Sequence, residues 1–199
     1  MNNAFNTMSP LILASTSPRR KELFEKLRIP FTVVASDYEE DMTLPLDPFV
    51  LAKTLSRGKA EKVAESFIDS VVVGADTFVA FNGKVLGKPH TTEKAMAMLK
   101  DIRGQWISII TGYTIMHRAT DRSISETVET KVLIAGATDE EIRRAYKRAK
   151  EVYDHDALCC YGLFDGAGLE GRVAPEQRGA IVAMELHSEA LVEIGRAHV

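Results

Sequence analysis

The sequence predicts an α/β fold in which helices flank one mixed sheet. Strand-like and helix-like segments alternate along most of the chain, which is typical of this class. The dipeptide Asn82-Gly83 lies between two β-rich runs and is the strongest short-range signal for a two-residue hairpin. Because a hairpin pairs its strands antiparallel while strand–helix–strand units pair them parallel, we expect both kinds of pairing in the sheet.

Periodicity and turn signals place the individual elements. Strands are expected at 11–14, 31–35, 70–81, 84–86, 106–117 and 124–135. Helices are expected from Ser17-Pro18, from Asp47-Pro48 to about Phe67, from Thr91 or Thr92 to Gly104, and from Thr138 to about Val152. After Tyr153 the signals weaken, with a β-like stretch at 180–183 and a helical one at 185–193.

The composition favours one soluble catalytic domain over residues 1–199. The 25 basic and 28 acidic residues leave a formal charge of -3, so nothing demands a nucleic acid or a membrane surface as partner. No apolar run approaches the roughly 20 residues that span a bilayer. The first residues lack the layout of a signal peptide, so we expect a cytoplasmic protein with a flexible extension at 1–9.

The metal-ligand inventory favours oxygen. The two cysteines, Cys159 and Cys160, are adjacent, and no CxxC or HExxH spacing is present to hold zinc. A metal ion in this protein would therefore sit on carboxylates and other oxygen ligands.

Two cations interrupt apolar helix stripes. Arg19 is in step with Leu23 and Leu27, and Lys59 is in step with Leu55 and Val63. A buried, unpaired ammonium costs several kcal/mol, so Lys59 must reach a carboxylate or open onto a site that binds an anion. The residues alone leave a structural ion pair and a ligand contact equally open, and snorkelling is the alternative for Arg19.

Asp76 is the first candidate for catalysis, because it lies within an apolar strand, where a carboxylate is costly unless it binds a metal or acts as a base. In a plain two-residue hairpin, Thr77 would pair across from Lys88. Alternation would then send Asp76 and Lys88 to opposite faces, so a bulge near Gly74 or Gly87 is needed if both serve one site.

Five short motifs in register carry a family resemblance. They are Ala14-Ser15-Thr16-Ser17-Pro18-Arg19-Arg20, Glu39-Glu40, Arg57-Gly58-Lys59-Ala60, Gly74-Ala75-Asp76-Thr77 and Gly87-Lys88-Pro89. In order and spacing they resemble the Maf family of nucleotide pyrophosphatases over about residues 10 to 150. The resemblance implies an elongated mixed sheet with two lobes around a cleft, shared with inosine triphosphate pyrophosphatases, and metal-dependent cleavage between the α and β phosphates.

The resemblance also assigns roles to matching residues. Asp76 and Glu40 would hold Mg²⁺ or Mn²⁺, with Asp76 as base or metal ligand. Phosphate contacts are expected from the triphosphate-neutralising cations and from neighbouring hydroxyls: Lys59, Lys88, Arg19, Arg20, Ser15, Ser17 and Thr77. Relatives imply a homodimer.

The motifs Ser17-Pro18-Arg19-Arg20 and Ala75-Asp76-Thr77 look like the branch acting on dTTP, UTP and modified pyrimidine nucleotides. The alternatives are the branch hydrolysing 7-methyl-GTP and, in a different class, a non-catalytic regulator of septum formation. The stretches at 158–166 and 181–186 depart from the family pattern. The run 194–199 resembles a translated sequencing adapter, which indicates a non-native tail.

Overall fold

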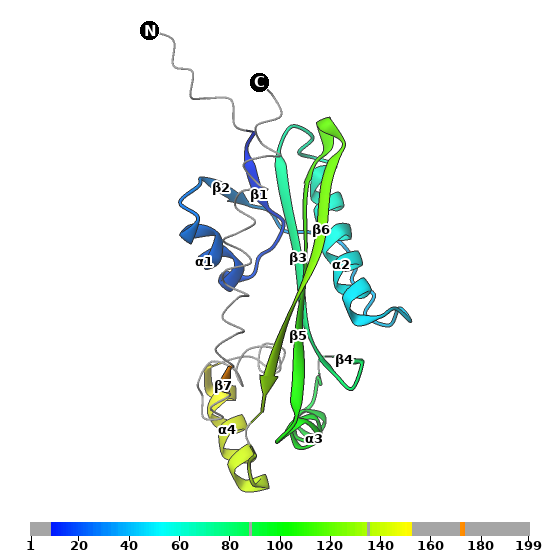
Figure 1. Ribbon diagram of the computed structural model, residues 1–199. Helices are drawn as coiled ribbons and strands as arrows, with labels where there is room; N and C mark the ends of the chain where they lie inside the picture. The colour runs from blue at the N-terminus through cyan, green and yellow to red at the C-terminus, as the bar shows by residue number, and fades with distance from the viewer. Residues whose placement is uncertain (1–8, 88, 135, 153–171, 174–199) are drawn as a thin grey trace. The chain divides into compact units, whose positions relative to one another are not determined.

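The computed structural model describes residues 9–87, 89–134, 136–152 and 172–173 (Figure 1). The elements in chain order are β1 (Leu11–Leu13), α1 (Pro18–Lys26), β2 (Phe31–Val33), α2 (Pro48–Ala64), β3 (Val71–Phe81), β4 (Lys84–Leu86), α3 (Thr92–Ile102), β5 (Trp106–His117), the 3₁₀ turn η1 (Arg118–Thr120), β6 (Arg122–Leu133), α4 (Asp139–Val152) and β7 (Arg172–Val173). The segments expected at 180–183 and 185–193, the tail at 194–199 and Lys88 lie outside the described residues.

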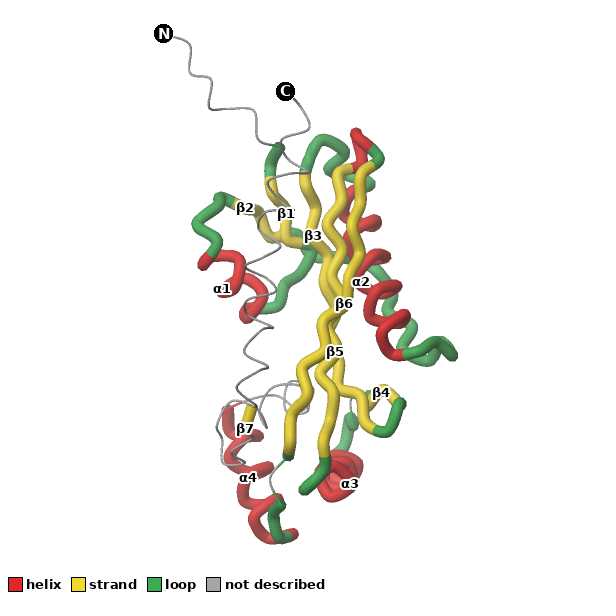
Figure 2. The backbone as a smooth tube through the Cα atoms, in the orientation of Figure 1, coloured by secondary structure: helices red, strands yellow, loops and turns green. Residues whose placement is uncertain are grey.

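The strands form one mixed sheet, as predicted. Its order is β2-β1-β3-β5-β6-β7, with β4 paired to β3 (Figure 2). Strand β1 runs parallel to both β2 and β3, whereas β4 runs antiparallel to β3. None of the helices in the described ranges is long and apolar enough to cross a membrane.

The β3–β4 hairpin has the predicted two-residue turn. Asn82 and Gly83 have φ angles of 49° and 73°, which is the positive-φ pair that a type I′ turn requires. The described ladder runs from the pair Phe81–Lys84 to the pair Val79–Leu86. The expected pairing of Thr77 with Lys88 lies beyond that ladder and stays a prediction.

The described residues divide into two compact units. The first contains residues 9–77 and 111–128, and the second contains 78–110, 129–152 and 172–173, apart from the positions not described. In the first unit, alternate residues of β1 and β3 face opposite ways. Leu13 and Val73 pack in a cluster with Phe24 of α1, while Val72 packs in another with Ala60 of α2.

The apolar face of α1 contains the residues that the sequence placed on it. Phe24 is the buried residue of this helix, and Leu23 and Leu27 are half-buried. The large aromatic ring decides the rotation of this short helix, because it packs edge-on against Phe31 with ring centroids 5.4 Å apart. Arg19 is half-buried, like Leu23 and Leu27 with which it is in step.

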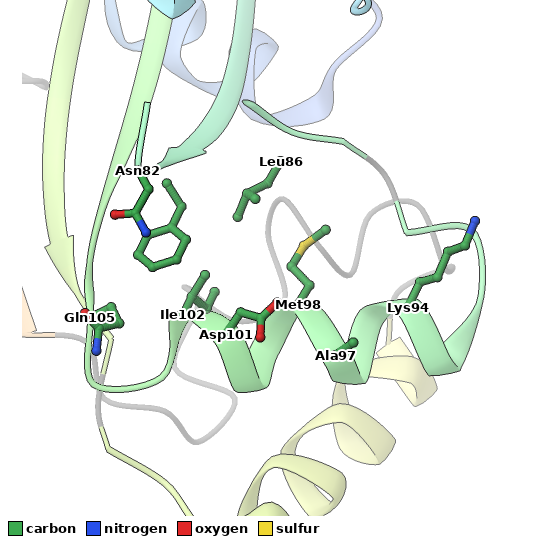
Figure 3. Close-up of a pocket in the computed structure, with 9 residues that line it drawn as sticks. Asn82, Leu86, Lys94, Ala97, Met98, Asp101, Ile102 and Gln105 are labelled. Carbon is green, nitrogen blue, oxygen red and sulfur yellow. The ribbon is translucent and has the colours of Figure 1, made fainter. Parts of the chain in front are cut away.

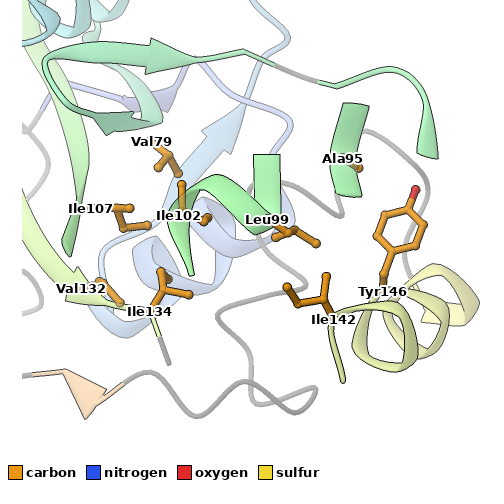
Figure 4. Close-up of a cluster of buried hydrophobic side chains, with 9 residues drawn as sticks. All are labelled: Val79, Ala95, Leu99, Ile102, Ile107, Val132, Ile134, Ile142 and Tyr146. Atoms are coloured by element: carbon orange, nitrogen blue, oxygen red, sulfur yellow. The ribbon is translucent and has the colours of Figure 1, made fainter. Parts of the chain in front are cut away.

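The second unit has its own core, to which helices α3 and α4 both contribute (Figure 4). The expected helix signals are confirmed: the Thr91 side chain accepts a bond from the amide of Lys94, and Gly104 has a φ of 67° just after α3. Thr138 and Glu141 make the reciprocal bonds of a capping box at the start of α4.

A hollow of about 660 Å³ also lies in the second unit, between the hairpin turn and α3 (Figure 3). Its apolar wall includes Phe81, Leu86 and Met98, and its polar groups include Lys94 and Asp101. The volume is large enough for a small molecule. None of the described candidate residues lines this hollow, however, so the predicted chemistry belongs to the first unit.

Candidate active site

Two glycines bring helix α2 directly onto the sheet. A Cβ atom on Gly74 of β3 would lie 2.4 Å from the carbonyl oxygen of Ser56, and one on Gly112 of β5 would lie 2.1 Å from that of Ala52. Real Cβ atoms do not approach backbone atoms so closely, so only glycine fits at either position. The close approach places Lys59, on the same part of α2, beside Asp76 in the middle of β3.

Lys59 lies between two carboxylates. This residue is only 8% exposed, which confirms that it belongs to the buried stripe. The ammonium donates a short hydrogen bond to Oδ1 of Asp76, which is 6% exposed, and it lies 2.8 Å from Oε1 of Glu40. Of the two alternatives left open by the sequence, the structure displays the ion pair, and this arrangement gathers two acidic oxygens around one cation.

Burial dominates the electrostatics of Asp76. Loss of water raises the pKa of this carboxyl above its ordinary value, while the Lys59 ammonium and, more weakly, the Arg20 guanidinium act in the opposite direction. The neighbouring charge of Glu40 raises the pKa further. A carboxylate with a raised pKa accepts a proton more readily than an exposed one, as a general base must.

A second group of polar side chains surrounds the Arg20 guanidinium. It donates to Oγ of Ser15 at 3.2 Å and to Oγ1 of Thr77 at 3.3 Å. The Thr77 hydroxyl lies 3.1 Å from that of Thr111 on β5. Thr77 directly follows Asp76 in β3, and the charge of Arg20 opposes the rise in the pKa of Asp76. The polar group around Arg20 therefore lies close to the ion pair of Lys59 and Asp76.

Among the described residues, the acceptors that bind this guanidinium are the hydroxyls of Ser15 and Thr77. In the part of the chain that the structure describes, no ion pair joins Arg20 to a carboxylate. Arg20 is half-buried, so its charge is partly withdrawn from water, and the nearby Asp76 carboxylate acts on it at a distance. A planar donor in that state is suited to binding an oxyanion such as a phosphate.

Three other predicted site residues are Ser17, Arg19 and Lys88. Ser17 is the N-cap of α1, as expected, but its side chain makes no capping hydrogen bond, and its amide donates to Oγ of Ser15 at 3.3 Å. Arg19 lies in the first turn of α1 and is half-buried. The position of Lys88 relative to Asp76 is not described, so the predicted bulge stays untested.

The sequence analysis gave no role in the site to Thr111, whose hydroxyl contacts Thr77. The strand that carries it was predicted correctly. Nothing in the spacing, however, indicates which residue of β5 lies beside Thr77, because that depends on the register between the two strands.

The two carboxylates have the chemistry to hold a divalent cation. Among the described residues, no group of three or more His, Cys, Asp or Glu side chains is arranged around one metal position. Mg²⁺ in nucleotide sites is commonly held by one or two carboxylates together with phosphate oxygens of the substrate. Asp76 and Glu40, which already converge on the ammonium of Lys59, fit that pattern.

The fold and this group of residues define a mixed α/β protein in which a half-buried guanidinium, a group suited to oxyanions, lies close to a buried carboxylate. The profile of the family described as Maf-like protein matches residues 10–170. The chain is 42% identical over 144 residues to a dTTP/UTP pyrophosphatase from Carboxydothermus hydrogenoformans, covering 72% of this chain and 76% of the relative. The chain therefore belongs to the Maf family.

Two further comparisons bear on substrate and fold. A 7-methyl-GTP pyrophosphatase from Polaromonas is 37% identical over 163 residues, which cover 82% of this chain and 72% of the relative. The solved structure of the Ham1 protein from Staphylococcus aureus has a TM-score of 0.55 at 13% identity and covers 92% of this chain and 99% of that one. At that identity the likeness concerns the fold alone, and it confirms the predicted fold class.

Proposed function

We propose that this protein hydrolyses nucleoside triphosphates to monophosphates and pyrophosphate, with dTTP, UTP and modified pyrimidine nucleotides as its preferred substrates. The observation that carries the proposal is the half-buried Arg20 guanidinium, which hydroxyls hold beside the buried carboxylate of Asp76. A cation in that state stabilises negative charge on a phosphate chain. The choice of base rests on the dTTP/UTP pyrophosphatases among the relatives.

Substrate binding would use the polar end of β1 and the start of α1. The phosphate oxygens would accept hydrogen bonds from Arg20, Arg19 and the hydroxyls of Ser15 and Ser17, and the amides at the start of α1 add further donors. Lys88 would add a cation from the segment after β4. Mg²⁺ or Mn²⁺ would be held by Asp76 and Glu40 and would supply further charge neutralisation on the phosphates.

Asp76 would then act as the general base. It takes a proton from a water molecule, whose oxygen forms a bond to the α-phosphorus while the bond from that phosphorus to the α,β-bridging oxygen breaks. Pyrophosphate leaves with the bonding electrons, and its new charge faces the cations. Lys59 would keep Asp76 ionised in its buried position and would lie close to the substrate's phosphates.

The proposed partner is the free nucleotide. The slightly negative formal charge of -3 gives no support to binding of nucleic acid. The homodimer implied by relatives remains part of the proposal, and light scattering on the purified protein would test it.

The decisive experiment is pyrophosphate release from a nucleotide panel with Mg²⁺ or Mn²⁺. We expect activity on dTTP and UTP, and a loss of about 10³-fold or more in Asp76→Asn, because the base is removed. Asp69→Asn is the matched control, since Asp69 is exposed and lies just before β3. Release of single phosphates would contradict the proposed bond cleavage.

The panel also separates the alternatives. A preference for 7-methyl-GTP would assign the chain to the same chemistry with a different base, as in the Polaromonas relative. Inactivity of a folded protein on every nucleotide would favour the non-catalytic regulator.

A further inference from the structure

The ring of Tyr38 lies against Gly58 on helix α2. A Cβ atom built on Gly58 would be 2.3 Å from Cε2 and Cζ of Tyr38 and 2.8 Å from its hydroxyl oxygen. The phenol ring therefore fills the space that any other side chain at position 58 would need. This contact joins the acidic loop after β2 to the middle of α2.

The same contact explains an unfavourable residue. Glycine inside a helix costs about 0.5–1 kcal/mol relative to alanine, because it restricts the unfolded chain less. Gly58 lies in the interior of the 17-residue helix α2. Alanine would form a better helix at this position, but its Cβ atom would have to displace the Tyr38 ring from its place on α2.

The contact lies next to the candidate site on both sides. Gly58 precedes Lys59, and Glu40 is two residues beyond Tyr38. Glu40 reaches Lys59 with 2.8 Å between Oε1 and Nζ, although its side chain is 44% exposed. An ion pair with so exposed a carboxylate is worth about 0–1 kcal/mol, which is too little to order a loop.

Other contacts of this loop are local. The amide of Tyr38 donates to Oγ of Ser36 at 3.4 Å, and the amide and hydroxyl of Thr43 donate to Oδ1 of Asp41 at 2.9 and 2.6 Å. These bonds shape turns within the loop but do not attach it to α2. Tyr38 is half-buried, so its ring contributes part of the roughly 1.5–3 kcal/mol that complete burial of such a side chain gives, in addition to the exposed ion pair of Glu40.

We infer that the contact between Tyr38 and Gly58 holds the acidic loop on α2. The contact thereby positions Glu40 to bind the divalent metal ion beside the substrate's phosphates. Tyr38 is in this view a positioning residue that acts through Glu40. The inference rests on the proposed function for its catalytic consequence, but the docking itself does not depend on it.

The first test measures docking without any reaction. Hydrogen–deuterium exchange of residues 36–43 is compared in the wild type, Tyr38→Ala, Gly58→Ala and the conservative control Tyr38→Phe. We expect exchange about tenfold faster in the two disruptive variants, which corresponds to roughly 1.4 kcal/mol of lost docking. The phenylalanine variant should exchange within about twofold of the wild type, because the ring remains. Equal exchange in all four proteins would overturn the inference.

The second test asks whether Tyr38 acts through Glu40. Pyrophosphate release from dTTP is measured for Tyr38→Ala, Glu40→Gln and the double variant at several Mg²⁺ concentrations. We expect each single variant to raise the KM for Mg²⁺ and the double variant to resemble Glu40→Gln alone. Additive losses would show that Tyr38 acts elsewhere and would contradict the positioning role.

The outcome of each test is independent of the other. If the wild type releases no pyrophosphate from any nucleotide, the proposed function is wrong, and the exchange measurement still decides whether Tyr38 seats the loop. Thermal unfolding of Gly58→Ala adds a check on a purely structural role. The gain in helix propensity offsets part of the lost packing, so its kcat/KM should fall further than its Tm shift explains.

Discussion

Replacing Gly74 with alanine tests the packing that brings Lys59 to Asp76. The new Cβ atom would lie 2.4 Å from the carbonyl oxygen of Ser56 and 2.7 Å from the amide nitrogen of Ala60. Both are backbone atoms, so the helix has to retreat by about 1 Å to restore an ordinary contact of 3.4 Å. Overpacking of this kind costs about 1–3 kcal/mol.

The same displacement should act on the site. A misplacement of about 1 Å in a catalytic group can reduce a rate by about 10²-fold. We therefore expect Gly74→Ala to lower kcat/KM for dTTP by about that factor. Its Tm should fall by about 2–4 °C for each kcal/mol of lost stability.

The assays are urea unfolding and pyrophosphate release, with Gly136→Ala as the matched control. A Cβ atom on Gly136 meets nothing within 4 Å, so that variant should keep both stability and activity. Unchanged unfolding of Gly74→Ala would refute the packing argument. Lost stability with full activity would instead refute the link between the position of α2 on the sheet and catalysis.

Three further predictions concern separate parts of the molecule. Arg20→Gln should lower kcat/KM for dTTP by about 10- to 100-fold in steady-state kinetics, as expected for about 1.5–3 kcal/mol from a charged hydrogen bond, and full activity would remove Arg20 from the site. Hydrogen bonds from Lys100 and Arg103 lower the pKa of Asp139, so its stabilising contribution is present above the ordinary carboxyl pKa and is lost as the pH falls through the lowered one. The stability of Asp139→Asn, followed by circular dichroism during acid unfolding, should therefore depend less on pH than that of the wild type. An unchanged pH dependence would contradict this. Gly83→Ala should cost about 1 kcal/mol in urea unfolding because of the φ of 73°, and a stability equal to the wild type would mean that the hairpin turn relaxes without strain.

Local chemistry was sufficient for most of the secondary structure. The Asn82-Gly83 turn, the proline-led helices α1 and α2 and the capping box of Thr138 depend on residues close together in sequence, so their signals survive in the sequence alone. Spacing also marked Leu23 and Leu27 on the apolar face of α1. The deeper burial of Phe24 depends on its packing against Phe31 of the neighbouring strand β2.

Part of the candidate site could likewise be predicted from the sequence, and part could not. A charged residue in an apolar stripe marked Lys59, and a carboxylate in an apolar strand marked Asp76, because burial of charge is costly wherever it occurs. Which groups they meet is a matter of distance between segments far apart in sequence. The approach of α2 at Gly74, the register that sets Thr111 beside Thr77, and the ring of Tyr38 on Gly58 are all such contacts, and only the folded chain determines them.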